Sequence, residues 1–348
     1  MSSFRLAWRY LHKRRVQTVV MIAGVTLSLY LPIATHWLIS AFDEAIGARA
    51  AATPMLVGAK GSRFDLALHG LYFRSRVGGE VPYDEYTTLK ATGLARAIPL
   101  HARFTAGGQP VVGTTPGYFK LRKLRIVQGV SLALFGDCIL GAMVAERLNL
   151  SPGDKLKTDR ENLFDLAGDY PLQLNVKGVF DRMGSADDEA VFVSLKTSWI
   201  IAGIGHGHDK DDKTPAGSKL LKKHLEITPE NIDSFHFHGN SAEFPLTAIS
   251  LVPRDEKSAA LLLGRYQDHE GLQALKSPQV VAEMMRMVVQ VRQFLDAHYA
   301  LLASSTILLL AIIVVLSRRL RAREMETMFL LGCSRSVVLS LQAAELTI

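Results

Sequence analysis

The sequence predicts a membrane α-helical plus α+β protein. Two transmembrane helices flank a large mixed α/β extracytoplasmic domain, and a long stalk helix is continuous with the second of them. Three observations predict this fold. Two long runs contain no formally charged residue, Arg and Lys gather beside both runs, and the segment between them mixes β-like and helical patterns. In a chain of 348 residues, that segment is long enough to bury its own core.

The first apolar run covers residues 16–40 and follows a short basic segment, residues 1–15. A membrane helix needs about 20 apolar residues, whereas the apolar core of a signal peptide has only about 7–15. The run is therefore predicted to be transmembrane helix 1, an uncleaved anchor. Pro32 lies near its outer end, where a membrane helix tolerates proline.

The second apolar run, residues 299–317, is predicted to be transmembrane helix 2. Lys and Arg accumulate on the cytoplasmic side of membrane proteins. Because one basic cluster precedes the first run and another, Arg318 to Arg323, follows the second, both ends are predicted to be cytoplasmic. Residues 41–298 then lie outside. The alternative, two buried helices of a soluble protein, would not require Arg clusters at both ends.

The formal net charge of +7 resides entirely in the two ends, 1–15 and 318–348. The middle of the chain, residues 16–317, holds equal numbers of basic and acidic residues. A nucleic-acid-binding protein concentrates positive charge on a folded face. The distribution therefore excludes nucleic acid as a partner and points to membrane topology.

The extracytoplasmic segment is predicted to fold as an α+β domain. A short helix is expected at 141–150, ended by the turn Ser151-Pro152-Gly153-Asp154. Residues 205–240 are expected to be a His-containing insertion with an exposed loop. Runs rich in Val, Ile, Phe and Leu predict strands at 109–113, 172–180, 190–194 and 246–252.

A stalk helix is predicted at 279–298, continuous with the second span. Ser277 is expected to be the N-cap, with Pro278 at the first helical position. Apolar residues then recur at helical spacing, and no helix breaker separates them from the span. They are expected to pack on the domain or on a partner's stalk. The alternative is a separate helix with a kink near His298.

Enzyme motifs are missing from the chain. There is no phosphate loop of the type G-x-x-x-x-G-K-[ST], no G-x-S-x-G elbow and no H-E-x-x-H helix. The chain is therefore expected to be a non-catalytic subunit. The predicted topology puts Cys138 and Cys333 on opposite sides of the membrane, so they are not expected to pair.

After the second span, residues 323–335 have the sequence R-E-M-E-T-M-F-L-L-G-C-S-R. This segment resembles the signature of FtsX/MacB-type ABC transporter permeases, roughly R-E-I-x-x-L-x-x-L-G-A-S-R. The resemblance implies that residues 318–336 form a cytoplasmic coupling helix that contacts an ATPase. Its candidate coupling residues are Arg323, Glu324, Met325, Met328, Phe329, Leu331, Gly332, Ser334 and Arg335. Gly332 is expected to let the chain turn towards the next span, because glycine tolerates positive φ.

Two stretches of the outer segment are similar to the periplasmic domain of the same family. Residues 141–155 resemble G-x-x-x-A-x-x-L-x-L-x-P-G-D, and residues 112–129 resemble G-x-x-P-x-Y-F … G. The resemblance covers most of the chain except about 200–245. The chain departs from the four-span pattern of the family. Residues 337–348 look like the start of a third span, so a truncation before spans three and four is expected.

The resemblance also implies partners, a location and a way of working. Such permeases are multi-pass proteins of the bacterial inner membrane. Their membrane helices contact lipid, and their large domain is periplasmic. They work as dimers with a separate cytoplasmic ABC ATPase, which binds ATP, and with periplasmic partners. Their mechanotransmission serves export or the handling of lipoproteins and other envelope cargo. The cargo of this chain does not follow from its sequence.

A two-span membrane receptor with an extracytoplasmic sensing domain is the alternative function. Receptors also flank an outer domain with two spans, but they continue into a long cytoplasmic region with coiled-coil heptads. Here the residues after the second span turn apolar again by Val337. The permease is therefore the preferred function.

Two H-x-H pairs, His206 with His208 and His236 with His238, are candidate metal ligands. Residues two apart in an extended segment point to the same side, so each pair can present two imidazoles to one ion. Neutral imidazole suits Zn²⁺, Cu²⁺ and Ni²⁺. The candidate cofactor is zinc. Four residues between the two pairs are candidates to complete its four-coordinate shell, namely Asp209, Asp211, Asp212 and His224. The alternative is a solvated polar loop without metal.

Overall fold

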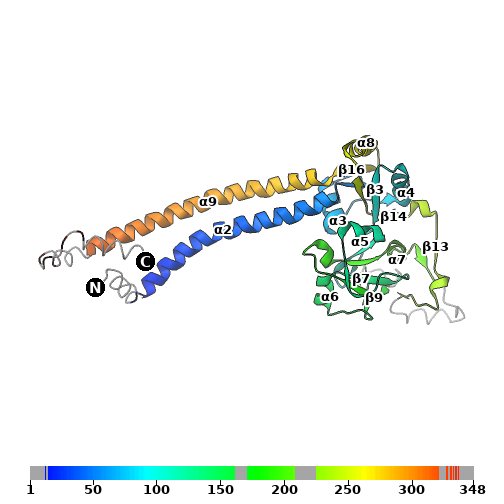
Figure 1. The fold of residues 1–348 in the computed structure, drawn as a ribbon, viewed down its shortest axis with the longest axis horizontal. Coiled ribbons are helices and arrows are strands. Elements are labelled where there is room, and N and C mark those ends of the chain that lie inside the picture. The colour runs from blue at the N-terminus through cyan, green and yellow to red at the C-terminus, as the bar shows by residue number, and fades with distance from the viewer. Residues whose placement is uncertain are drawn as a thin grey trace. The chain divides into compact units, whose positions relative to one another are not determined.

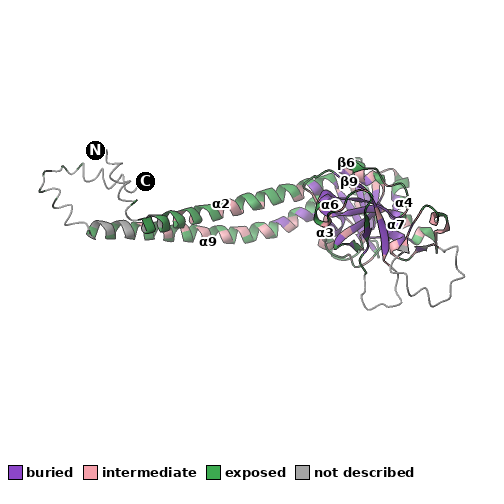
Figure 2. Ribbon diagram, turned by 90° about the horizontal axis from the view of Figure 1, so that it is seen from below, coloured by how far each residue is buried: buried purple, intermediate pink, exposed green. Residues whose placement is uncertain are grey.

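The computed structural model of the chain describes His12, residues 15–160, 171–207 and 225–320, and also Thr327, Leu330, Gly332, Ser334 and Ser336. The chain divides into two compact units. Residues 44–284 form the outer unit, an α/β domain. The other unit, residues 1–43 and 285–348, contains most of two long helices. Figure 1 shows both helices and the domain, and Figure 2 shows that buried residues concentrate in the domain.

The two long helices are α2, Arg15–Ala52, and α9, Ser277–Leu320. Within them, Ile22–Ala52 and Ser277–Ile312 are long and apolar enough to cross a membrane, with mean hydropathies of 1.5 and 1.6. Hydroxyl contacts link the two helices. Thr35 Oγ1 lies 3.1 Å from Tyr299 Oη, and Ser28 Oγ lies 3.4 Å from Thr306 Oγ1. Because the position in α9 falls as the position in α2 rises, the pair is antiparallel. The 44-residue α9 confirms the predicted stalk continuous with the second span.

The first sheet of the outer unit joins the ends of both long helices. Its strand order is β16-β1-β15-β3, and all neighbours are antiparallel. Strand β1, Met55–Ala59, follows α2 almost directly, and β16, Leu272–Lys276, leads straight into α9. Met55 pairs with Lys276, and the Ser277 N–H extends this ladder by donating to the Pro54 carbonyl at 2.9 Å. The two helices therefore end in neighbouring strands.

The second sheet has the order β12-β9-β7-β10-β5-β4, with β6 and β8 also paired to β9. It is mixed, since β10 is parallel to β5 and antiparallel to β7. Its central strands are buried on both faces. Val191 and Val193 contribute to one core cluster, and Phe192 contributes to the other. This explains why Val111–Val112 and Ala190–Val193 are uninterrupted apolar stretches rather than alternating ones.

The remaining strands and the shorter helices complete the outer unit. The remaining strands of the first sheet are β15 (Ala248–Pro253) and β3 (Ala95–Leu100). The second sheet contains β4 (Thr105–Ala106), β5 (Gln109–Thr114), β6 (Ile126–Gly129), β7 (Asp137–Leu140), β8 (Lys155–Lys157), β9 (Leu172–Phe180), β10 (Val191–Ser194) and β12 (Leu225–Glu226). Two short ribbons pair β2 (Val81–Pro82) with β14 (Pro245–Leu246) and β11 (Gly205–His206) with β13 (His236–Phe237). The helices are α3 (Arg63–Tyr72), α4 (Tyr83–Thr92), α5 (Pro116–Arg122), α6 (Ala142–Leu148), α7 (Leu195–Ile201) and α8 (Glu256–Gln267), with 3₁₀ turns η1 (Ala186–Glu189), η3 (Ile232–Ser234) and η4 (Ser241–Glu243).

The predicted strands and the short helix before the Ser151–Asp154 turn are present, with two local differences. The apolar run 246–252 is divided between β14 and β15, because the Thr247 hydroxyl and N–H both bond to the Leu100 carbonyl. Ser277 begins α9 but does not cap it through its side chain. Its hydroxyl is buried and has no hydrogen-bond partner among the described residues, and its N–H is used by Pro54.

His101 lies where the two sheets meet, since it bridges to Gly113 of β5 just after β3 ends. The Ser198 hydroxyl donates to the Leu195 carbonyl, so His101 Nδ1, 3.0 Å from Ser198 Oγ, donates to that oxygen. Burial, followed by the nearby charges of Arg103 and His69, lowers the pKa of His101 from 6.5 to about 3. His101 therefore stays neutral in the folded protein.

The outer unit should lose stability as the pH falls below 6.5, because the unfolded chain then binds a proton that folded His101 does not accept. Above pH 6.5 there is no such loss. Below it, the free energy of unfolding should fall by about 1.4 kcal/mol per pH unit from this group. Urea unfolding of the chain at pH 7.5 and 5.0 measures the change. The His101→Gln variant should be less stable at pH 7.5 but show a shallower pH dependence, and an unchanged dependence would contradict the assignment.

Candidate functional site

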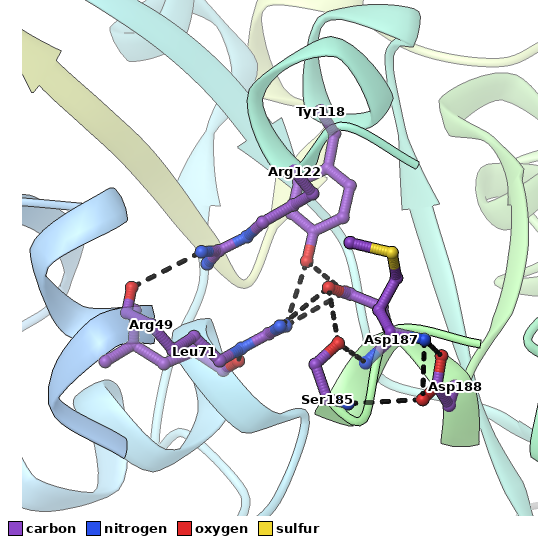
Figure 3. Close-up of polar contacts among 8 residues, drawn as sticks. Arg49, Leu71, Tyr118, Arg122, Ser185, Asp187 and Asp188 are labelled. Carbon is purple, nitrogen blue, oxygen red and sulfur yellow. Dashed lines mark hydrogen bonds and ion pairs between the residues drawn. The ribbon is translucent and has the colours of Figure 1, made fainter. Parts of the chain in front are cut away.

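The end of α2 is fixed to the outer unit by a buried ion pair (Figure 3). Arg49, in the last turn of α2, donates two hydrogen bonds to the carboxylate of Asp187 in η1, at 2.6 and 2.9 Å. Both side chains are more than nine-tenths buried. The Tyr118 hydroxyl donates to Asp187 at 2.6 Å and accepts from Arg49 at 3.1 Å. Arg49 Nε also donates to the Leu71 carbonyl. Paired, planar contacts of this kind are the strong form of ion pair in proteins.

The main chain of α2 is held at the same place. The last carbonyls of a helix have no partner within it and carry the negative end of its dipole. Arg122 Nη1 donates to the Arg49 carbonyl at 3.3 Å, and the Tyr72 hydroxyl donates to the Ile46 carbonyl at 3.0 Å. A guanidinium is therefore placed where a helix C-terminus favours a cation. We call Arg49, Tyr118, Arg122 and Asp187 the α2 clamp.

The electrostatics of the clamp favour its charged form. Burial by itself would raise the pKa of Asp187, but the hydrogen bond and charge of Arg49 outweigh burial, so that the pKa is lowered. Burial and the neighbouring Asp187 charge raise the pKa of Tyr118 to about 12, so its hydroxyl keeps its proton and remains a donor. The clamp thus consists of an ionised carboxylate, two guanidinium groups and a neutral phenol.

Asp187 is positioned by the local structure of η1. The Ser185 hydroxyl accepts from the Asp187 N–H, and Asp188 accepts from the Ser185 N–H, which forms a capping box. Gly141 lies against this turn. A Cβ at Gly141 would come within 2.3 Å of the Asp187 carbonyl oxygen, so only glycine fits there. The conformation that presents Asp187 to α2 therefore depends on Gly141.

Both motifs noted in the outer segment have a physical role at the clamp. Tyr118 belongs to the stretch 112–129, and Gly141 begins the stretch 141–155. Tyr118 also packs in an aromatic cluster with Phe73, Phe119 and Phe192. The clamp thus connects α2 to elements beside both sheets.

A family model for the MacB-like periplasmic core domain matches residues 18–214, more than half of the chain. The chain belongs to this family. It is a MacB/FtsX-type ABC transporter permease, with two apolar candidate membrane helices and a MacB-like periplasmic domain. The family consists of permease subunits that are generally non-catalytic and work with a cytoplasmic ABC ATPase. No curated protein matches the chain.

Solved structures of periplasmic or extracellular permease domains also match the MacB-like chain. The periplasmic region of MacB from Actinobacillus actinomycetemcomitans has 12% identity and a TM-score of 0.40, covering 67% of this chain and 94% of that one. The extracellular domain of YknZ, a noncanonic ABC-type transporter from Gram-positive bacteria, has 12% identity and a TM-score of 0.36, covering 64% of this chain and 99% of that one.

Most of the predicted coupling residues of this MacB-like permease lie outside the described part of the chain: Arg323, Glu324, Met325, Met328, Phe329, Leu331 and Arg335. Gly332 and Ser334 are described. Gly332 has a φ of 89°, in the left-handed region expected for a glycine at a turn. The Ser334 hydroxyl lies 2.8 Å from that of Ser336.

Of the four candidate metal ligands, His208 lies outside the described residues, as do Asp209, Asp211, Asp212 and His224. His206 pairs with His236 in the β11–β13 ribbon, and the rings of His236 and His238 are in contact. Among the described side chains, no group of three or more His, Cys, Asp or Glu is gathered around one point. The structure thus pairs the main chain of His206 with that of His236, and His238 follows β13 directly.

The sequence analysis did not identify the α2 clamp. The available signal was a lone arginine at the end of a long apolar helix, together with the tyrosine and glycine in the two motifs. The partner of Arg49 lies 138 positions away, and no local pattern indicates that pairing.

Proposed function

We propose that this chain is the permease subunit that couples ATP hydrolysis by a separate cytoplasmic ABC ATPase to movements of its periplasmic domain. The observation that carries this proposal is the joint between helices and sheet. Strand β1 follows α2, β16 precedes α9, and the two strands are hydrogen-bonded neighbours. A displacement of either helix end therefore acts on the same sheet.

The α2 clamp extends this coupling to the second sheet. Asp187 lies in η1, which leads into β10, and Tyr118 lies in α5, which follows β5. Because β5 and β10 are neighbouring parallel strands, a displacement of Arg49 would be transmitted through Asp187 and Tyr118 to the centre of that sheet. Interiors are close-packed and transmit strain. The domain is therefore expected to follow α2 as a body.

The working unit in this proposal is a dimer in the bacterial inner membrane. Apolar side chains at helical spacing on the stalk part of α9, Met287, Val291 and Phe294, are 54, 61 and 73% exposed in the single chain. A second stalk or the lipid surface would cover them. The periplasmic domain would then act on a periplasmic partner, in export or in the handling of lipoproteins and other envelope cargo.

The cytoplasmic contact with the ATPase is assigned to the segment from Arg323 to Arg335. Replacing Gly332 by valine should lower cargo-coupled ATPase activity several-fold, because a β-branched residue is strained at positive φ. Among the described residues, no neighbouring atom lies within 4 Å of a Cβ at this position, so the expected strain is that of the backbone. The comparison is Gly24→Val in α2, where no positive φ is imposed and a Cβ is also unobstructed. Equal coupling in both variants, at equal membrane insertion, would contradict the assignment.

Co-purification tests the proposed function itself. The chain, solubilised in detergent from its own cells, should retain a cytoplasmic ABC ATPase and raise the rate at which that ATPase hydrolyses ATP. A variant ATPase that cannot hydrolyse ATP should still bind. The proposal would be wrong if no ABC ATPase associates and the chain instead alters the activity of a signalling protein. That result would favour the alternative function, a two-span membrane receptor.

A further inference from the structure

The segment 120–130, from the end of α5 to the residue after β6, has a buried side and an exposed side. Leu121, Leu124 and Ile126 pack against a hydrophobic core cluster of the outer unit. Because side chains alternate along an extended chain, the residues between them point away from that core. The exposed side chains of the segment are Lys120, Lys123, Arg125, Val127, Gln128 and Val130. We call these residues the α5–β6 surface.

The α5–β6 surface carries positive charge that no nearby acid neutralises. Residues 112–136 include four cations, Lys120, Arg122, Lys123 and Arg125, and no Asp or Glu. Within the described part of the chain, none of these four forms an ion pair. Arg122 is buried and donates to a main-chain carbonyl, so its charge adds to the field of the three exposed cations. A cluster of one sign attracts ligands of the opposite sign.

Large apolar side chains are exposed beside these cations. Five such side chains are exposed among the described residues of the outer unit, and three of them, Val127, Val130 and Leu134, lie in or just after the segment. Single apolar residues scattered on a surface are ordinary, whereas a concentration of them marks a surface that binds something. Cations next to apolar side chains are typical of segments that lie at a membrane surface, where anionic headgroups meet acyl chains.

The α2 clamp attaches this segment to a candidate membrane helix. Tyr118 and Arg122 of α5 both contact Arg49 in the last turn of α2 (Figure 3). The part of α2 that is long and apolar enough to cross a membrane, Ile22–Ala52, includes that turn. The basic end of α5 is therefore held where the helix ends. Phospholipid headgroups are the anions expected beside the end of a membrane helix.

We propose that the α5–β6 surface docks the periplasmic domain onto anionic phospholipid of the membrane that α2 enters. Lys120, Lys123 and Arg125 bind the headgroup phosphates. Val127 and Val130 enter the boundary between headgroups and acyl chains. The docking requires negatively charged lipid, because the three cations supply most of the attraction, and it weakens as salt screens them.

Fluorescence quenching in nanodiscs tests the proposal with the full chain. A fluorophore is attached to Val130→Cys in a chain with Cys138→Ala and Cys333→Ser, and the quencher is a nitroxide on the lipid headgroup. Quenching should be strong in discs that contain phosphatidylglycerol and weak in discs of phosphatidylcholine alone. Replacing Lys120, Lys123 and Arg125 by Gln should lower the docked population roughly a hundredfold, since each cation at an anionic surface contributes about fivefold.

Two controls separate charge from folding and position. The triple variant Lys120→Arg, Lys123→Arg and Arg125→Lys keeps the charge and should keep the quenching. A fluorophore on Leu261→Cys in α8, which is also exposed, should not be quenched in either lipid.

The docking would be overturned by equal quenching with and without phosphatidylglycerol, or by quenching that persists in the triple Gln variant. The absence of quenching in both lipids would also overturn it, and would leave an acidic protein as the partner that this surface fits. Because the discs contain no ATPase, the result is independent of the proposed permease function.

Discussion

Replacing Arg49 by methionine should destabilise the outer unit by about 3–5 kcal/mol, because the Asp187 carboxylate is then buried without its cation. Asp187 keeps the Tyr118 hydroxyl, which is a neutral donor and does not replace a guanidinium. Urea unfolding of the chain, followed by tryptophan fluorescence, measures the loss. Trp199, buried in the outer unit, reports on that unit.

An exposed ion pair provides the matched control. Arg63 and Glu283 lie 2.8 Å apart, with the Arg63 side chain 55% exposed. Arg63→Met should cost less than about 1 kcal/mol, since exposed pairs contribute little. Combining Arg49→Met with Asp187→Leu should restore most of the lost stability, because no buried charge then remains. If Arg49→Met costs no more than Arg63→Met, the clamp does not hold α2.

A flexible Gly-Ser insert after His298 should leave ATP hydrolysis running and abolish its effect on the periplasmic domain. The proposed coupling depends on α9 being one unbroken helix between the membrane and β16. The Gly-Ser insert breaks that rigidity, because glycine is a poor helix former and leaves the backbone flexible. The readout is the nucleotide-dependent change in hydrogen exchange at β1 and β16, in the chain reconstituted with its ATPase.

The control for this variant is an Ala-rich insert of the same length, about seven residues or roughly two helical turns. This insert keeps α9 helical and leaves the residues on either side of it on nearly the same helix face. The nucleotide-dependent change in hydrogen exchange at β1 and β16 should therefore be retained at least in part. Loss with the Gly-Ser insert and retention with the Ala-rich insert support rigid coupling. Retention with both would show that signals reach the domain by another route.

Features with a local cause could be predicted from the sequence. Long uncharged runs predicted α2 and α9, because helix length and apolar surface are properties of neighbouring residues. Strand β9 was predicted with the bounds 172–180 that the structure has, since its apolar residues are contiguous. The continuity of α9 followed from the absence of a breaker near His298.

Features that depend on residues far apart in the sequence could not be predicted from it. Ser277 looks like an N-cap, but its N–H pairs with Pro54, a residue brought there by the β1–β16 ladder. Nothing near Arg49 indicates Asp187, and nothing near His206 indicates its register with His236. Gly141 and Tyr118 were visible as motif residues, but the reason for each is contact with η1 or Arg49 across the fold.

The distance between the periplasmic domains of two copies, with and without ATP, tests the central claim most directly. Val127 in β6 is 55% exposed and can carry a spin label after Val127→Cys, in a chain with Cys138→Ala and Cys333→Ser. In membranes containing the ATPase, the label-to-label distance should change on ATP binding. That change should disappear in Arg49→Met at a temperature where this variant is folded. A distance that is the same with and without ATP, in a complex that hydrolyses ATP, would contradict the account.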